Sequence, residues 1–204
     1  FQSAVNVATD AIDCIHTTAA SHGRVFIVEV MGHKVGWLTL HAGIAGGADI
    51  ILLPEIPYDI NSVVKALEKR SAQGKRFSIL AVAEGAISKE DAALSKKELK
   101  AKRKKMAYPS ISYEIGAQIQ EKTGIDSRAT ILGHVQRGGN PTLKDRVNAT
   151  RMGYYAVKLL EEGKTNRVVA LQQGNLVDYD IQEALRMKKP LDMDLYNMMM
   201  EISF

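Results

Sequence analysis

The sequence has 204 residues, 46% hydrophobic and 25% charged, with 27 Lys and Arg against 23 Asp and Glu for a formal net charge of +4. These values describe a folded globular chain of one large domain or two small ones, and they exclude a disordered or fibrous protein. The single cysteine, Cys14, excludes an intramolecular disulfide and points to a reducing compartment, so we expect a cytoplasmic protein. No uncharged stretch reaches the ~20 residues of a membrane-spanning helix, so we expect no membrane partner.

Helix and strand patterns alternate along the chain. Val25 to Val30 and Phe77 to Ala83 are almost continuously apolar, as in strands that are buried on both faces of a parallel sheet. Five strands separated by helices predict right-handed crossovers and an α/β fold, a doubly wound, mostly parallel sheet with helices on both faces. In chain order we predict helix 3–20, strand 25–30, helix 37–45, strand 49–53, helix 61–73, strand 77–83, helix 110–122, strand 129–132, helix 143–162, strand 167–171 and helix 179–187.

The net charge is concentrated between Ser88 and Lys105, where eight basic residues stand against three acidic ones. A basic run of this kind can bind nucleic acid. Because no aromatic residue interrupts it, and because Leu94 and Leu99 suit an exposed helix or a long loop, the pattern favours a solvated face. We therefore expect no nucleic-acid partner.

Three of the predicted strands end in chemically active residues. They are followed by Met31-Gly32-His33, by Glu84-Gly85, and by the segment from His134 to Gly139. Ligands of doubly wound sheets bind beyond the carboxyl ends of the strands. The Arg137 guanidinium, the His134 imidazole and the Gly138-Gly139 backbone suit an anion such as phosphate, and Arg128 stands at the start of the same strand. The alternative is a loop in which Arg137 pairs with a helix carboxylate such as Asp145. The spacing predicts no metal site.

A longer motif contains this segment. Residues 128–146, Arg-Ala-Thr-Ile-Leu-Gly-His-Val-Gln-Arg-Gly-Gly-Asn-Pro-Thr-Leu-Lys-Asp-Arg, resemble the phosphofructokinase signature at every defined position. The resemblance extends over essentially the whole chain, through segments 28–32, 45–47, 54–55 and 83–84. It implies transfer of a phosphoryl group from ATP or pyrophosphate, with Mg²⁺, to the 1-hydroxyl of fructose 6-phosphate.

The resemblance also implies roles for individual residues. His134 and Arg137 would hold the 6-phosphate of the sugar, and Arg24 and Arg128 would reach that phosphate in a neighbouring subunit, which requires a homo-oligomer, either a dimer or a tetramer. Met31 and Gly32 would line the sugar, and Glu84 would accept hydrogen bonds from its hydroxyls. Where the family usually has an arginine after Met-Gly, this chain has His33, so stabilisation of the moving phosphoryl group would depend on pH.

The family's N-terminal half, with its donor loops and catalytic base, has no counterpart in this sequence. We therefore expect no catalytic residue here, no cofactor bound by this fragment alone, and a chain that binds the sugar phosphate without turning it over. The alternative is a non-catalytic regulatory or interaction module that kept the fold. By resemblance, residues 1–135 form the sugar-phosphate lobe, 136–175 pack on the absent donor lobe, and 176–204 form a C-terminal helical segment.

Overall fold

The computed structural model describes residues 1–21, 23–105 and 107–203, so residue 204, the last of the predicted C-terminal segment, lies outside them. The chain divides into two compact units. The first consists of residues 4–139 and 191–204, and the second of residues 1–3 and 140–190. No helix in the described ranges is both long enough and apolar enough to cross a membrane.

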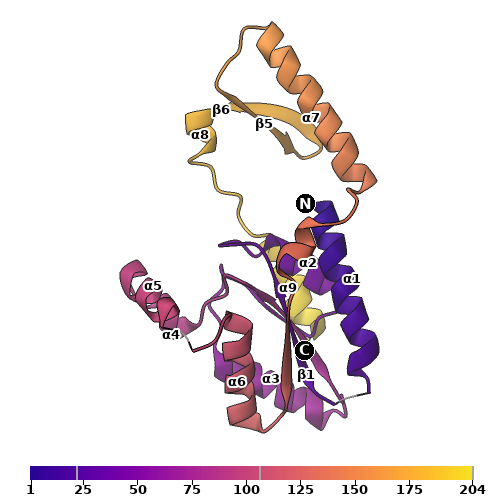
Figure 1. The fold of residues 1–204 in the computed structure, drawn as a ribbon, viewed down its shortest axis with the longest axis vertical. Helices are drawn as coiled ribbons and strands as arrows, with labels where there is room; N and C mark the ends of the chain where they lie inside the picture. The colour runs from indigo at the N-terminus through magenta and orange to yellow at the C-terminus, as the bar shows by residue number, and fades with distance from the viewer. Residues whose placement is uncertain (22, 106, 204) are drawn as a thin grey trace. The chain divides into compact units, whose positions relative to one another are not determined.

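The first unit is a parallel sheet with helices on both faces, which confirms the predicted fold class. Its strands lie in the order β2-β3-β1-β4, and every neighbouring pair is parallel. Figure 1 shows α1 on one side of this sheet and α3 and α6 on the other. The elements are α1 (Gln2–Ala19, whose first two residues belong to the second unit), β1 (Val25–Val30), α2 (Trp37–Ala45), β2 (Ile50–Leu52), α3 (Ile60–Ala72), β3 (Ser78–Ala83), α4 (Lys89–Ala92), α5 (Lys96–Lys104), α6 (Ile111–Thr123), β4 (Ser127–Ile131), the 3₁₀ turn η1 (Gly133–Arg137) and α9 (Met193–Ser203).

The core lies on both faces of the sheet because successive strand side chains point to opposite sides. Phe26, Val28 and Val30 of β1 pack with the apolar faces of α1 and α2. Val25 and Ile27 of the same strand pack with α3 and α6. All six residues of β1 and of β3 are buried, whereas the edge strand β4 is partly exposed. The continuous apolar runs in the sequence therefore correspond to central strands.

The basic run forms α4 and α5, which Figure 1 shows standing away from the sheet of the first unit. A capping box of Ser95 and Glu98 begins α5, and none of its residues is buried. Lys102 forms an ion pair with Asp91, and Arg103 donates to the Ala86 carbonyl oxygen. The basic residues therefore lie mainly on a solvated helix, as the pattern predicts.

The second unit contains a hairpin, and here two predictions are wrong. Strand 167–171 does not join the parallel sheet, because β5 (Arg167–Gln172) pairs antiparallel with β6 (Asn175–Asp180). Residues 179–187 do not form one helix, because 179 and 180 belong to β6 and α8 covers only Ile181–Ala184. Gln173 and Gly174, with φ of 49° and 83°, form the two-residue turn with positive φ at both positions that favours a tight hairpin.

The long helix of the second unit, α7 (Leu143–Glu161), carries exposed apolar side chains along its length. Thr142 caps its first turn by accepting from the Asp145 N–H. The exposed apolar residues are Leu143, Val147, Tyr154, Val157 and Leu160. Apolar surface on one helix is typical of a face that packs on another part of a protein.

Asp145 is held by hydrogen bonds within the second unit. The Ser3 N–H and Ser3 hydroxyl both donate to its Oδ2, the N–H at 2.7 Å. These hydrogen bonds favour the charged carboxylate and hold the pKa of Asp145 well below its usual value.

Replacing Asp145 with asparagine should lower the unfolding free energy of the second unit by about 1 kcal/mol at pH 7. Because the carboxyl pKa is lower in the folded chain, its stabilisation is present above the unfolded pKa of about 4 and is lost as the pH falls through the folded pKa. The difference in unfolding free energy between wild type and Asp145→Asn should therefore become smaller below pH 4. Hydrogen exchange of the α7 amides at pH 7 and at acidic pH measures it, with Asp13→Asn, at an exposed position on α1, as control.

Candidate functional site

The site lies at the carboxyl edge of the sheet in the first unit. Because β3, β1 and β4 are neighbours and parallel, the segments that follow them lie at one edge. They are Glu84-Gly85 after β3, Met31-Gly32-His33 after β1, and η1 after β4. The sheet topology thus brings together the three strand ends that the sequence singled out.

Glu84 links the loop after β3 to the loop after β1. Its Oε1 accepts from the Gly32 N–H at 3.2 Å and also from the His33 N–H. The side chain is half-buried, and its carboxylate carries further lone pairs that can accept from a ligand. The loop after β1 is therefore held by a side chain from the neighbouring strand end.

Close backbone contacts fix the same pair of loops. His33 has a φ of 55°, in the left-handed region, and its ring is exposed. A Cβ on Gly85 would lie 2.0 Å from the His33 carbonyl oxygen, and a Cβ on Gly32 would lie 2.4 Å from the Val35 carbonyl oxygen. Only glycine fits at positions 32 and 85 without a backbone shift.

The guanidinium and the imidazole of the site stand on η1. In a 3₁₀ turn the side chains at positions i and i+3 lie on the same side, so His134 and Arg137 share one face. Both are exposed, and Arg137 forms no ion pair with any residue that the structure describes. Asp145, the alternative partner considered for Arg137, accepts from Ser3 instead. The guanidinium and the imidazole are therefore available to an anion.

Arg24 and Arg128 lie at the opposite edge of the sheet, where β1 and β4 begin. Arg24 Nε is 2.9 Å from Asp126 Oδ2, and Arg128 Nη1 is 2.7 Å from Asp126 Oδ1. One carboxylate thus holds both guanidiniums side by side, and all three side chains remain partly exposed. Within one chain these arginines do not join His134 and Arg137.

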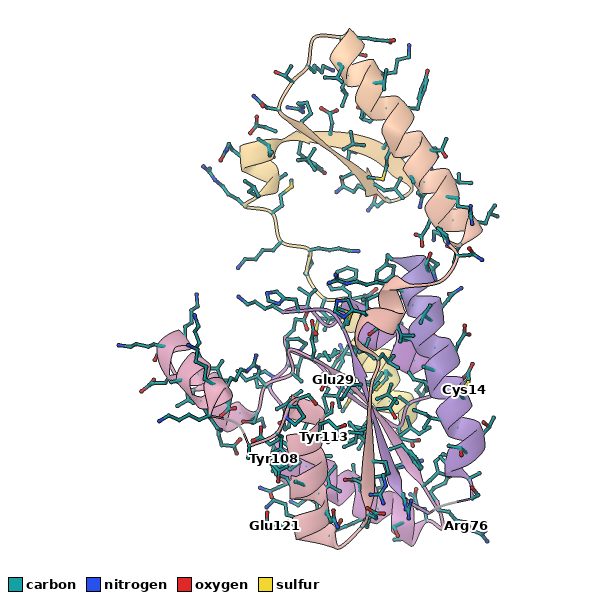
Figure 2. The ribbon with its side chains drawn as sticks, in the orientation of Figure 1. Cys14, Glu29, Arg76, Tyr108, Tyr113 and Glu121 are labelled. Carbon is teal, nitrogen blue, oxygen red and sulfur yellow. The ribbon has the colours of Figure 1, made fainter. Side chains whose placement is uncertain are left out.

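Sequence reasoning gave no role to several residues that shape the site. Gln136 is buried in η1, and its Oε1 accepts from the Met31 N–H at 2.6 Å. Glu29, labelled in Figure 2, is a buried carboxylate on β1 that accepts from the Ser112 N–H at the start of α6. The partners of these residues are 105 and 83 positions away, and no local pattern indicates such contacts.

A cavity of about 320 Å³ lies elsewhere in the first unit, beside the edge strand β2. It is lined mainly by apolar side chains of β2, α3 and α9, and Lys89 is the one basic residue among its lining residues in the described chain. None of the predicted site residues lines it. The chemistry of a phosphorylated ligand therefore favours the carboxyl edge over this cavity.

The fold and the site define an α/β protein with a candidate anion-binding edge. The family model described as Phosphofructokinase matches residues 1–160. The chain belongs to the phosphofructokinase family, which confirms the resemblance carried by residues 128–146.

Relatives named as ATP-dependent 6-phosphofructokinases match nearly all of the chain. That of Spirochaeta thermophila is 50% identical over 194 residues, which are 95% of this chain and 53% of the relative. That of Bacillus cytotoxicus is 44% identical over 203 residues, which are 100% of this chain and 56% of the relative. The chain thus spans about half the length of these curated relatives.

Solved structures agree with the family assignment. The phosphofructokinase of Saccharomyces cerevisiae superposes with a TM-score of 0.74 at 33% identity, covering 90% of this chain and 23% of that one. The pyrophosphate-dependent phosphofructokinase of Marinobacter aquaeolei has a TM-score of 0.70 at 18% identity, and the match covers 94% of this chain and 48% of that one. At that identity the second likeness concerns the fold alone.

Proposed function

We propose that this chain is the fructose 6-phosphate-binding part of a 6-phosphofructokinase, the enzyme that phosphorylates the 1-hydroxyl of that sugar in glycolysis. The observation that carries the proposal is the junction of three strand ends at one sheet edge. It combines a guanidinium, an imidazole, a half-buried carboxylate and a backbone loop held in place. A dianionic phosphate and a polyhydroxyl sugar need that combination of donors and acceptors.

In this proposal each group has one task. His134 and Arg137 bind the 6-phosphate, which fixes one end of the sugar and orients its 1-hydroxyl. Met31 and Gly32 line the sugar, and the lone pairs of Glu84 that the two amides leave free accept from its hydroxyls. His33 takes the place of the arginine that the family usually has after Met-Gly, so its stabilisation of the transferred phosphoryl group would depend on pH.

Arg24 and Arg128 complete the site of a neighbouring subunit. Their position at the other sheet edge supports this, since they lie away from His134 and Arg137 in their own chain. Asp126 orders both guanidiniums without burying them. The protein that acts on fructose 6-phosphate is then a homo-oligomer in which each phosphate is bound from two chains.

ATP is the proposed donor, supported by the names of the relatives that are 44–50% identical. Mg²⁺ would accompany that nucleotide and neutralise the charge that develops on its phosphates. The described residues of this chain contain no group of three or more His, Cys, Asp or Glu that suits a metal ion. We assign no step to a metal held by these residues. Because the chain spans 53–56% of the length of these relatives, we also propose that the donor site and the catalytic base lie outside residues 1–204.

Fructose 6-phosphate at one hundred times its Kd should raise the thermal midpoint of the 204-residue chain by about 5 °C, because such saturation is worth about 2.7 kcal/mol. Differential scanning fluorimetry measures the shift, and unphosphorylated fructose at the same concentration is the control. Adding Mg²⁺ and ATP should give no fructose 1,6-bisphosphate. A folded chain with no shift would instead support the non-catalytic module, and product formation would refute inactivity.

A further inference from the structure

The loop after β1 has three consecutive backbone N–H groups that are all bound by side chains. Glu84, from the end of β3, accepts from Gly32 and His33, and Gln136, from η1 after β4, accepts from Met31. The loop is thus held from both neighbouring strand ends. Glu84 already has a role in the proposed site, whereas Gln136 has none.

Gln136 is not explained by stability. Gln136 is only 3% exposed, and its Nε2 atom is buried without a hydrogen-bond partner among the described residues. A buried donor without a partner is unfavourable, and it offsets much of what the single hydrogen bond to Met31 contributes. In a native structure such a group needs an explanation, and a role in a functional site is one of them.

The position of Gln136 within η1 suggests what it does. His134 and Arg137 lie on the exposed face of the turn, and Gln136 points into the protein. Its 2.6 Å hydrogen bond to the Met31 N–H ties the turn to the loop after β1 at one point. That contact constrains where the face that carries His134 and Arg137 lies relative to Met31 and Gly32.

We propose that Gln136 is a positioning residue of the sugar-phosphate site, which couples the phosphate-binding turn η1 to the loop that lines the sugar. The inference rests on the proposed function for its ligand. A ligand that spans both segments depends on this coupling, whereas a ligand bound by η1 alone does not. Fructose 6-phosphate spans both in the proposed site, whereas inorganic phosphate contacts η1 and the arginines of the neighbouring subunit but not the loop after β1.

The test uses the 204-residue chain with Gln136→Met, which removes both polar atoms at similar volume. The Kd for fructose 6-phosphate should rise about 10-fold, which corresponds to the loss of about one hydrogen bond between the displaced segments and the ligand. The Kd for inorganic phosphate should change less than about 3-fold. Hydrogen exchange at the Met31 amide should accelerate about 10-fold or more, while exchange at Gly32 stays slow.

Three further variants complete the test. Gln136→Glu keeps an acceptor for Met31 and should restore slow exchange there, and Gln120→Met, at an exposed position on α6, should change nothing. If Gln136→Met does not fold, Gln136→Asn replaces it, because its shorter side chain stays polar but falls short of Met31.

Unchanged exchange at Met31, or equal weakening of both ligands, would overturn the positioning role. A wild-type chain that binds neither ligand would instead overturn the proposed function, and with it the role of Gln136 in ligand binding. The hydrogen bond between Gln136 and Met31 would then be tested by exchange alone, through the difference at the Met31 amide between wild type and Gln136→Met.

Discussion

Replacing Arg137 with glutamine is expected to weaken the binding of fructose 6-phosphate about 30-fold. A hydrogen bond to a charged group is worth about 2 kcal/mol, and an Arg–phosphate pair is among the stronger ones. Because Arg137 is exposed and forms no ion pair within the described chain, the substitution leaves no protein group unpaired. The unfolding free energy should therefore change by less than about 0.5 kcal/mol. Isothermal titration calorimetry and urea unfolding measure the two quantities.

A matched control separates local from general electrostatics. Arg186→Gln removes the same charge at another exposed arginine, which lies after α8 in the second unit. If the phosphate were attracted only by the net positive charge, both variants would bind equally weakly, and the loss would disappear at high salt. Wild-type affinity in Arg137→Gln would show that this guanidinium does not contact the phosphate.

Residue type and chain order were enough to predict four of the five strands and their parallel arrangement. The runs at 25–30 and 77–83 have no alternation, and both became strands buried on two faces. Helix 37–45 begins and ends at the predicted residues, and the segment 133–137 follows a strand as expected. Polar residues directly after apolar runs thus indicate which segments gather at the carboxyl edge of a parallel sheet, where ligands of such folds bind.

The hairpin of the second unit was not predicted, for a local reason. The alternation of helices and strands up to residue 167 favours another crossover, whereas the two-residue Gln173-Gly174 turn leads straight back into an antiparallel strand. Arg167 Nε donates to Asp178 Oδ2 at 2.6 Å, and the Tyr155 hydroxyl donates to Oδ1 of the same carboxylate. Those hydrogen bonds lower the pKa of Asp178, and no single-sequence pattern reveals them.

The residues of the candidate site could be named from the sequence, but their contacts could not. His134, Arg137 and Glu84 follow strands, so their placement at one edge follows from topology. The hydrogen bonds from Met31 to Gln136 and from Gly32 to Glu84 join positions 105 and 52 residues apart. Likewise, the shared Asp126 of Arg24 and Arg128 depends on β1 and β4 being neighbours. Strand order, which decides these pairs, is not encoded in any local segment.

Replacing Gly85 with alanine is expected to lower the unfolding free energy of the first unit by about 3 kcal/mol, and to abolish most of the binding of fructose 6-phosphate. The added Cβ would lie 2.0 Å from the His33 carbonyl oxygen, so one of the two loops must move. Either movement separates Glu84 from the Gly32 and His33 amides. Urea unfolding followed by the fluorescence of Trp37, the single tryptophan, reports the first unit, and calorimetry reports the affinity.

Gly74→Ala distinguishes crowding at the site from the general cost of replacing a glycine. Gly74 follows α3 with a φ of 80°, and a Cβ there would meet nothing within 4 Å. Alanine at position 74 therefore carries only backbone strain, about 1 kcal/mol, and should leave the affinity for fructose 6-phosphate unchanged. If Gly85→Ala behaved like Gly74→Ala in both measurements, the two loops could separate without consequence. The close contact between residues 33 and 85 would then have no part in holding the sugar phosphate.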